Sequence, residues 1–269
     1  MYFSFHIKNT SMTTKRPLIL VTNDDGIHAP GIRFLIKIMN TFGDVIVVAP
    51  DAPQSGMGHA ITINDTLYCE AIEVSKNEPQ KEFTCSGTPV DCVKIAVNEI
   101  LKQKPDLCVS GINHGSNSSI NVIYSGTMSA AVEAGTQGIP AIGFSLLDYS
   151  LDADFKPSEK FIKNIVSECF TNGMPKGVVL NVNIPKLSKE KIKGIKICRQ
   201  ANGHWEEKFD KRTNPLGRDY YWLTGKFINK DKGEDTDEWA LENDYISITP
   251  TQYDLTAHHA IKDINNWEL

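Results

Sequence analysis

Short β-branched runs alternate with helical patterns through the first 150 of the 269 residues. Residues 17–22, 44–49, 106–110 and 140–146 have the composition of buried strands, and helical periodicity fills most of the intervals between them. This alternation is typical of βαβ units, which build a parallel sheet covered by helices on both faces. The pattern therefore predicts an α/β, doubly wound, largely parallel sheet of Rossmann-like type.

The other expected elements divide the chain into a core and an extension. Helices are predicted at 30–43, 88–100, 127–138 and 157–171, and further strands at 60–66, 67–74, 83–86, 177–183, 194–198 and 245–249. Residues 203–242 look rich in loops, and the charge run at 229–238 predicts a solvated, mobile segment. We therefore expect an N-terminal extension at 1–16, an α/β catalytic core at 17–200 and a C-terminal extension at 201–269 with a returning strand.

Charge and composition exclude several classes of protein. Lys and Arg total 28 against 33 Asp and Glu, a net charge of −5, so no general positive field attracts a nucleic-acid duplex or an anionic membrane. No apolar run approaches the roughly 20 residues that span a bilayer. The six cysteines show no CxxC pair and no zinc-ligand spacing, and no secretory signal opens the chain. These features predict a cytoplasmic protein with free thiols.

Hard oxygen ligands follow three of the predicted strands. Asp24 and Asp25 follow the first strand, Ser55 lies in the loop after the second, and Asn113 follows the strand at 106–110. Because the carboxyl ends of parallel strands meet at one edge of the sheet, these side chains can converge on one pocket. Two neighbouring carboxylates repel each other, and a divalent cation relieves that repulsion. The set favours one Mg²⁺ or Mn²⁺ ion, with Ca²⁺ as an alternative in a crystal, and disfavours zinc and copper. A role of both acids as turn and cap residues is equally open.

A candidate phosphate site precedes the helix predicted at 127–138. Ser125, Gly126 and Thr127 offer backbone N–H groups, hydroxyls and the positive end of a helix dipole. Asn117 could contact the same phosphate, although its residue type is also common in simple Asx turns.

His258 is the histidine that we single out, because it follows the last predicted strand. A titrating imidazole there could act as a general acid toward a leaving alkoxide. Its neighbour His259 leaves a merely exposed pair of histidines equally open.

The stretch from Ile19 to Ile32, with Thr-Asn-Asp-Asp-Gly at its centre, resembles the opening signature of the SurE family of stationary-phase survival nucleotidases. Five later stretches resemble further family blocks in the same order: 49–56, 86–93, 105–113, 122–127 and 247–258. Together these blocks cover most of residues 17–260.

The resemblance implies a SurE-like fold and a metal-dependent 5′-nucleotidase. The expected reaction is hydrolysis of nucleoside 5′-monophosphates by metal-activated water, extending to 3′-monophosphates and short polyphosphate. Family metal ligands carry over to Asp24, Asp25, Ser55 and Asn113, and family phosphate contacts to four further residues: Asn117, Ser125, Gly126 and Thr127. Members exchange C-terminal segments, which implies a homodimer or homotetramer formed through the extension.

Two other functions remain as alternatives. A non-catalytic nucleotide or phosphate sensor could use the same pocket without turnover. A receiver-like signalling module also places paired acids after its first strand, but it needs a phospho-accepting Asp after a later strand. The matching positions here hold Ser55 and Asn113.

Overall fold

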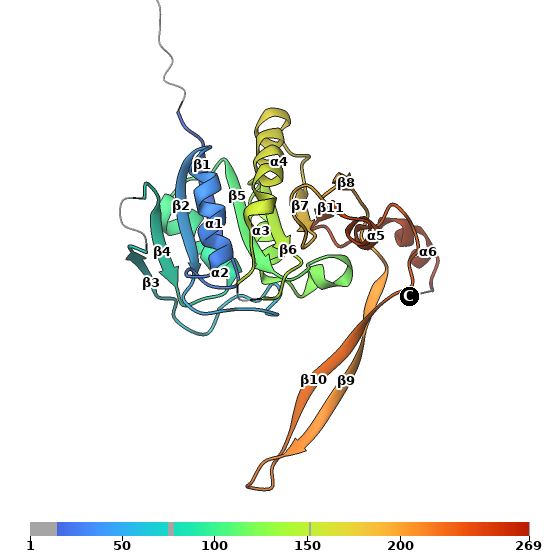
Figure 1. The fold of residues 1–269 in the computed structure, drawn as a ribbon. Helices are drawn as coiled ribbons and strands as arrows, with labels where there is room; N and C mark the ends of the chain where they lie inside the picture. The colour runs from blue at the N-terminus through green and yellow to red at the C-terminus, as the bar shows by residue number, and fades with distance from the viewer. Residues whose placement is uncertain (1–14, 75–77, 151, 269) are drawn as a thin grey trace, which may run out of the picture.

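A nine-stranded sheet runs through the body of the molecule in the computed structural model, which describes residues 15–74, 78–150 and 152–268 (Figure 1). Its strands are β1 (Leu18–Thr22), β2 (Asp44–Pro50), β3 (Cys69–Ile72), β4 (Lys81–Cys85), β5 (Leu107–His114), β6 (Ala141–Leu146), β7 (Val178–Ile184), β8 (Gly194–Ile197) and β11 (Tyr245–Gln252). The strands lie in the order β3-β4-β2-β1-β5-β6-β7-β11-β8. The six from β4 to β7 are mutually parallel, whereas β3 and β11 pair antiparallel with their neighbours β4 and β7. The α/β, doubly wound, largely parallel fold is therefore confirmed.

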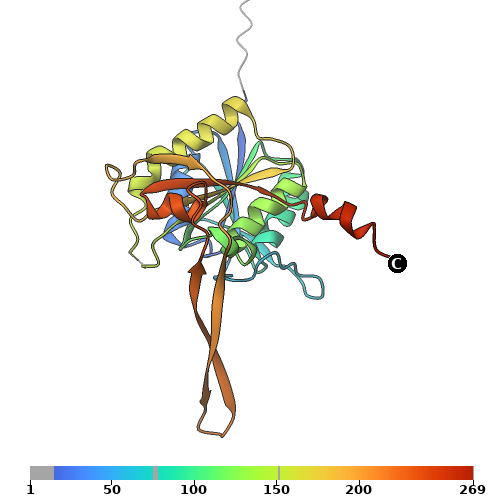
Figure 2. The same cartoon turned by 90° about the vertical axis from the view of Figure 1, so that its right-hand side faces the viewer.

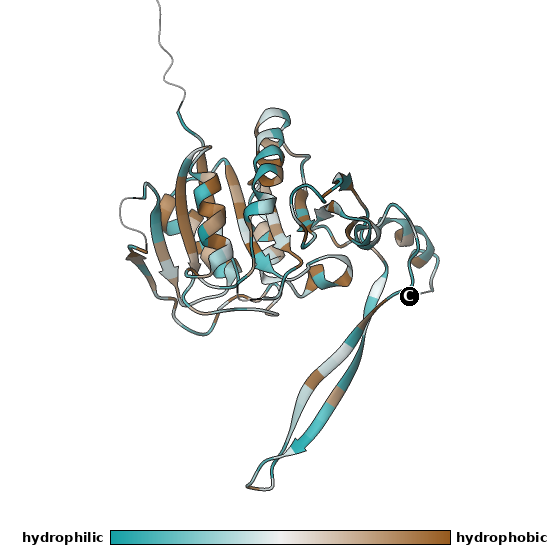
Figure 3. Ribbon diagram, in the orientation of Figure 1, coloured by the Kyte–Doolittle hydropathy of each residue, from teal (hydrophilic) through white to brown (hydrophobic). Residues whose placement is uncertain are grey.

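Helices cover both faces of this sheet, because side chains on each strand alternate between the faces. The helices are α1 (Pro30–Met39), α2 (Pro89–Ile95), α3 (Gly126–Thr136), α4 (Glu159–Asn172), α5 (Asp237–Glu242) and α6 (Ile261–Ile264). On β1, Ile19 and Val21 join the core cluster that contains α1 and α4, whereas Leu20 joins the cluster that contains α2 and α3. Figure 3 shows this apolar interior as brown strands and helix faces. In the described residues no helix is long and apolar enough to cross a membrane, and all six cysteines are free thiols.

A long two-stranded hairpin extends away from the body (Figures 1 and 2). It consists of β9 (Gly203–Thr213) and β10 (Asp219–Asn229), which pair antiparallel along their whole length. The prediction of a loop-rich stretch at 203–242 was therefore wrong. Most of the hairpin is exposed on both faces, so its sequence lacks the one-sided apolar alternation that identifies a strand.

The charge run at 229–238 is held by ion pairs, contrary to the prediction of a solvated, mobile segment. Arg199 donates from Nη1 to Asp231 at 2.6 Å and from Nε to Asp235 at 2.9 Å. Asp237, at the start of α5, is fully buried. Its Oδ2 accepts from the backbone N–H of Ser119 at 2.8 Å, and its Oδ1 accepts from that of Ala201 at 2.9 Å. The carboxylate thus joins the root of the hairpin to the core.

Three smaller differences concern the boundaries of elements. No strand forms at 60–66, and β5 continues to His114 instead of ending at 110. The helix after Thr88 widens into a π turn at 96–101. Short 3-10 helices form at Ser119–Ile123, Lys156–Ser158 and His258–Ala260. The irregular stretch at 60–66 is tied down by side chains instead of a strand partner, since the Thr62 hydroxyl donates to Asp91 at 2.7 Å.

We expect Asp237→Ala to lower the free energy of unfolding by about 2–4 kcal/mol, because it leaves buried backbone N–H groups without an acceptor. Urea denaturation of the variant and the parent protein measures this difference. Asp235→Ala is the matched control, because it removes a largely exposed carboxylate that is worth at most about 1 kcal/mol. Equal losses in the two variants would contradict the structural role of Asp237.

Candidate functional site

Asp24 and Asp25 lie directly beyond the carboxyl end of β1, where the chain turns sharply. Gly26 has a φ of +95°, a conformation that strongly favours glycine. The Asn23 side chain donates to the Gly26 carbonyl at 2.9 Å and closes the turn. The backbone therefore turns at Gly26, and the two acids do not have to follow the alternation of a strand.

Asp24 is almost completely buried, with 3% of its surface exposed. The Thr127 hydroxyl donates a hydrogen bond to its Oδ1. Burial and then the charge of Asp25 raise the pKa of Asp24 from 3.8 to about 6, against the opposing effect of Thr127. An ionised Asp24 is thus costly unless a positive charge approaches it.

Asp25 faces the end of β5, and the His114 backbone N–H donates to its Oδ2 at 3.3 Å. Burial raises the pKa of Asp25, while this hydrogen bond and the nearby His114 lower it. Asn113 is the preceding residue of β5 and is also buried. Its Nδ2 donates to the Gly115 carbonyl at 2.9 Å, and its Oδ1 accepts no hydrogen bond from the described part of the chain. The amide oxygen therefore has a lone pair available beside Asp25.

Ser55 lies in the loop after β2, and two backbone hydrogen bonds hold this loop against the site. The Gln54 N–H donates to the Asp24 carbonyl at 2.7 Å, and the Gly58 N–H donates to the Tyr124 carbonyl at 3.1 Å. Ser55 itself is exposed. The loop thus connects the turn after β1 with the segment that enters α3.

The amino end of α3 packs directly onto Asp24. A Cβ added at Gly126 would lie 2.7 Å from the Cβ of Asp24, so only glycine permits this approach. Ser125 caps the helix by accepting from the Met128 N–H at 3.0 Å. The positive end of the α3 dipole is therefore directed toward Asp24, and a backbone hydrogen bond from Thr127 helps to lower the pKa of that acid.

Asn117 belongs to a buried polar network instead of pointing freely toward a ligand. Its Nδ2 donates to the Ser145 hydroxyl at 2.8 Å, and its backbone N–H donates to Asn183 Oδ1 at 2.8 Å. Asn181 donates to its carbonyl at 2.8 Å. Sequence reasoning missed this network. The signal was two asparagines, two residues apart, in the otherwise apolar strand β7.

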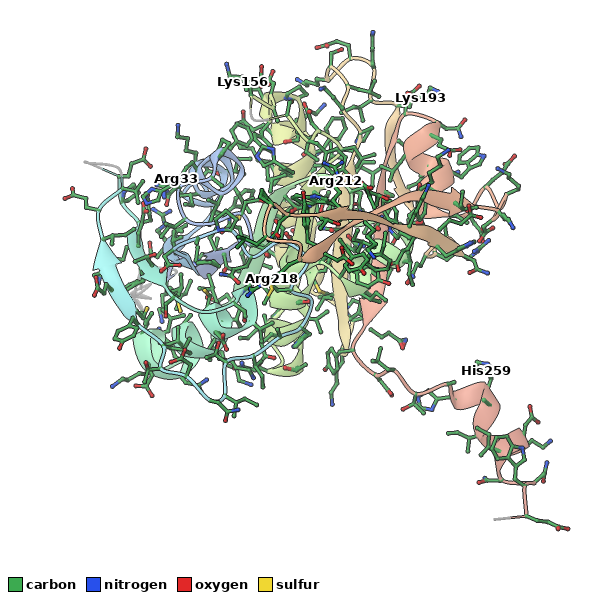
Figure 4. All side chains as sticks on the ribbon, turned by 90° about the horizontal axis from the view of Figure 1, so that it is seen from below. Arg33, Lys156, Lys193, Arg212, Arg218 and His259 are labelled. Atoms are coloured by element: carbon green, nitrogen blue, oxygen red, sulfur yellow. The ribbon has the colours of Figure 1, made fainter. Side chains whose placement is uncertain are left out.

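His258 is not brought to the carboxylates of its own chain. It is largely exposed, and its Nε2 lies 3.0 Å from an oxygen of Asp254. Figure 4 shows the adjacent His259 on an arm that leaves the body of the molecule. The chain after β11 runs outward, and His258 forms no hydrogen bond or ion pair with Asp24 or Asp25 in the described chain.

The remaining candidate ligands fit a hard divalent cation. Among the described residues no group of three or more His, Cys, Asp or Glu side chains could hold a metal. Two carboxylates would therefore be completed by the Asn113 amide oxygen and the Ser55 hydroxyl. An all-oxygen set of this kind suits Mg²⁺, Mn²⁺ or Ca²⁺. Neither Asp24 nor Asp25 forms an ion pair in the described chain, so the negative charge of both remains available to such a cation.

Comparisons with known proteins agree with this arrangement. The sequence profile of the family described as "Survival protein SurE" matches residues 19–207. A protein named 5′-nucleotidase SurE from Christiangramia forsetii is 72% identical over 258 residues, covering 96% of this chain and 99% of the relative. One with the same name from Flavobacterium johnsoniae is 68% identical over 259 residues, covering 96% and 99%. The crystal structure of the SurE protein from Aquifex aeolicus has 38% sequence identity and a TM-score of 0.80, covering 93% of this chain and 98% of that one. In sequence over nearly its whole length, and in fold, this chain belongs to the SurE family.

Proposed function

We propose that this chain is a metal-dependent 5′-nucleotidase that hydrolyses nucleoside 5′-monophosphates. The observation that carries the proposal is the buried Asp24 carboxylate, which lies between Asp25 and the amino end of α3 without an ion pair in the described structure. The relatives named 5′-nucleotidase SurE support the same reaction. We extend the proposal to 3′-monophosphates and short polyphosphate, because the residues assigned here would bind the phosphate group and not the base.

In this proposal Asp24, Asp25, Asn113 and Ser55 hold one Mg²⁺ or Mn²⁺ ion. When bound, such an ion neutralises phosphate charge and lowers the pKa of a water that attacks phosphorus. The N–H groups at the start of α3 and the Ser125 hydroxyl bind the phosphate oxygens and stabilise the charge of the transition state. Thr127 fixes the orientation of Asp24 through its hydroxyl hydrogen bond. Asn117 supports the loop after β5 from within the buried network.

We expect phosphate release from AMP to disappear after treatment with EDTA and to return when Mn²⁺ or Mg²⁺ is added. The reason is that an oxygen-only site binds these ions reversibly. A colorimetric phosphate assay on the dialysed protein measures the effect, and Zn²⁺ serves as the control ion. Turnover that persists in EDTA would contradict the metal assignment, and AMP binding without turnover in any metal would favour a nucleotide sensor.

We expect Asp24→Asn to stabilise the metal-free protein at pH 7 by up to about 3 kcal/mol. With a folded pKa raised to about 6, the stabilising neutral form of Asp24 is present below pH 4 and is lost as the pH rises through 6. Asparagine stays neutral at every pH, so the gain should vanish near pH 4. The same variant should lose the stabilisation that Mn²⁺ gives the parent protein.

Thermal unfolding at both pH values, with and without Mn²⁺, tests this prediction. Asp152→Asn is the control, because it neutralises an exposed carboxylate that makes no contact in the described chain. A variant that is less stable than the parent at pH 7 would show that Asp24 has a structural role instead.

We propose further that the hairpin joins copies of this chain into a dimer or tetramer. Tyr221, Trp222 and, in the turn, Leu216 are each more than half exposed, and an isolated two-stranded hairpin is at best marginally stable in water. We expect sedimentation velocity at micromolar concentration to show an oligomer. Replacement of residues 206–226 by a short Gly-Ser turn should shift it to monomer. A monomeric parent protein would contradict this proposal.

His258 can act as the general acid only on the site of a neighbouring copy. If it does, His258→Ala should lower turnover of AMP by about 10²- to 10⁴-fold. The loss should be much smaller on an aryl phosphate, because a phenolate leaves without a proton. Steady-state rates on the two substrates measure the difference. Equal losses on both would show that His258 only positions the C-terminal segment.

A further inference from the structure

A surface hollow of about 400 Å³ lies between the hairpin and the loop that carries Ser55. Trp205, Leu223 and Gly225 line it from the hairpin, and Gly56 and Tyr124 line it from the body. Glu207 and Thr224 complete the lining. The volume falls within the range of about 300–1,000 Å³ that small-molecule sites occupy.

The register of the hairpin creates the hollow. Trp205 pairs with Phe227, Glu207 with Gly225, and Phe209 with Leu223. These pairs lie on one face of the hairpin, because alternate residues point the same way. The glycine in the middle pair removes one side chain from a row of aromatic and aliphatic residues. The gap is therefore encoded in the sequence of the two strands.

The indole of Trp205 is held in a fixed orientation. Its Nε1 donates to Asn121 Oδ1 at 2.8 Å, and its ring meets Phe227 edge to face with centroids 5.8 Å apart. The indole remains 42% exposed despite these contacts. A large, rigid and partly exposed aromatic ring is a suitable surface on which a planar heterocycle can stack.

Two walls of the hollow are adjacent in sequence to the proposed metal and phosphate residues. Gly56 follows Ser55, and Tyr124 precedes Ser125, so each wall residue is one peptide away from a residue that we assign to metal or phosphate. The hydrogen bond from the Gly58 N–H to the Tyr124 carbonyl, at 3.1 Å, holds the two walls together. A molecule with its phosphate at the start of α3 can thus extend toward Trp205.

We infer that this hollow, defined by Trp205, Leu223, Gly225, Gly56 and Tyr124, binds the base of the nucleotide, an inference that rests on the proposed function. The base stacks on Trp205 and Tyr124 and passes over Gly225. Glu207 lies at the same level as Gly225, where its carboxylate can accept a hydrogen bond from an exocyclic amino group. The hairpin therefore provides the part of the site that distinguishes a nucleotide from a simple sugar phosphate.

The experiment compares AMP with ribose 5-phosphate, which is also a phosphate ester with a primary alkoxide leaving group but has no base. We expect Trp205→Ala to lower kcat/KM for AMP by about 10-fold or more, the usual effect of losing one base-stacking aromatic. Activity on ribose 5-phosphate should change by less than about two-fold, and Trp205→Phe should recover most of the AMP activity, since stacking tolerates any aromatic ring. Trp239→Phe is the control, because it changes a tryptophan of α5 that lies against Lys196 and does not line the hollow; both substrates should keep their rates.

An equal loss on AMP and ribose 5-phosphate, or no loss on either, would overturn the inference. A change in sedimentation of Trp205→Ala together with equal losses would show that the hollow is a contact between chains. Adenosine tests the hollow without any turnover: it should quench tryptophan fluorescence of the parent protein and of Trp239→Phe, but not of Trp205→Ala. If the parent hydrolyses neither phosphate but shows this quenching pattern, the proposed function fails while the base site stands.

Discussion

The carboxylate of Asp24 is buried where three backbone segments meet, and much of the local architecture follows from that position. The end of β1 supplies the acid, the amino end of α3 packs against it through Gly126, and the loop after β2 hydrogen-bonds to its carbonyl group. A buried carboxylate next to a second one destabilises a folded chain unless a cation, a proton or strong hydrogen bonds compensate it. In the described structure the compensation within the chain consists of the Thr127 hydroxyl, backbone hydrogen bonds from Asp24 and Thr127, and the dipole of α3, and the pKa of Asp24 still lies above its ordinary value. The site is therefore built to gain stability from a ligand of positive charge.

The polar character of this edge extends below the acids. Thr22, Asn23 and Ser110 are completely buried, and each has a side-chain oxygen without a hydrogen-bond partner in the described chain. Thr22 and Ser110 are register partners on β1 and β5. Unpaired polar atoms of this kind cost free energy, and they are rare in protein interiors. Three of the five such atoms in the described chain lie at this edge, where parallel sheets bind ligands, and the other two belong to Ser247 and Thr249 of β11.

Those parts of the structure that depend on neighbouring residues could be predicted from the sequence. Buried strands such as β1 and β6 are nearly continuous apolar runs, and α2 begins at Thr88 with a capping box to Asp91, as expected. The turn at Gly26 was predictable because few residues other than glycine adopt its φ. Contacts between distant segments were not predictable in the same way. Nothing local in the sequence indicates that Asp237 accepts hydrogen bonds from Ser119, or that Asn117 meets β7.

The hairpin of β9 and β10 was not recognised in the sequence, although it contacts the segment that leads into the proposed site. A strand is recognised when one of its faces is apolar, but β9 and β10 pack against each other and not against the core, so neither face needs to be uniformly apolar. At its root, however, the hairpin makes a defined side-chain contact with the body: Trp205 donates a hydrogen bond to Asn121 in the segment that leads into α3. Asp237 ties the same segment to the start of α5. The hairpin root and the amino end of α3 are thus joined through residues 119–124, which end directly before Ser125. The same short segment therefore anchors the element that reaches away from the body and leads into the element that we assign to phosphate.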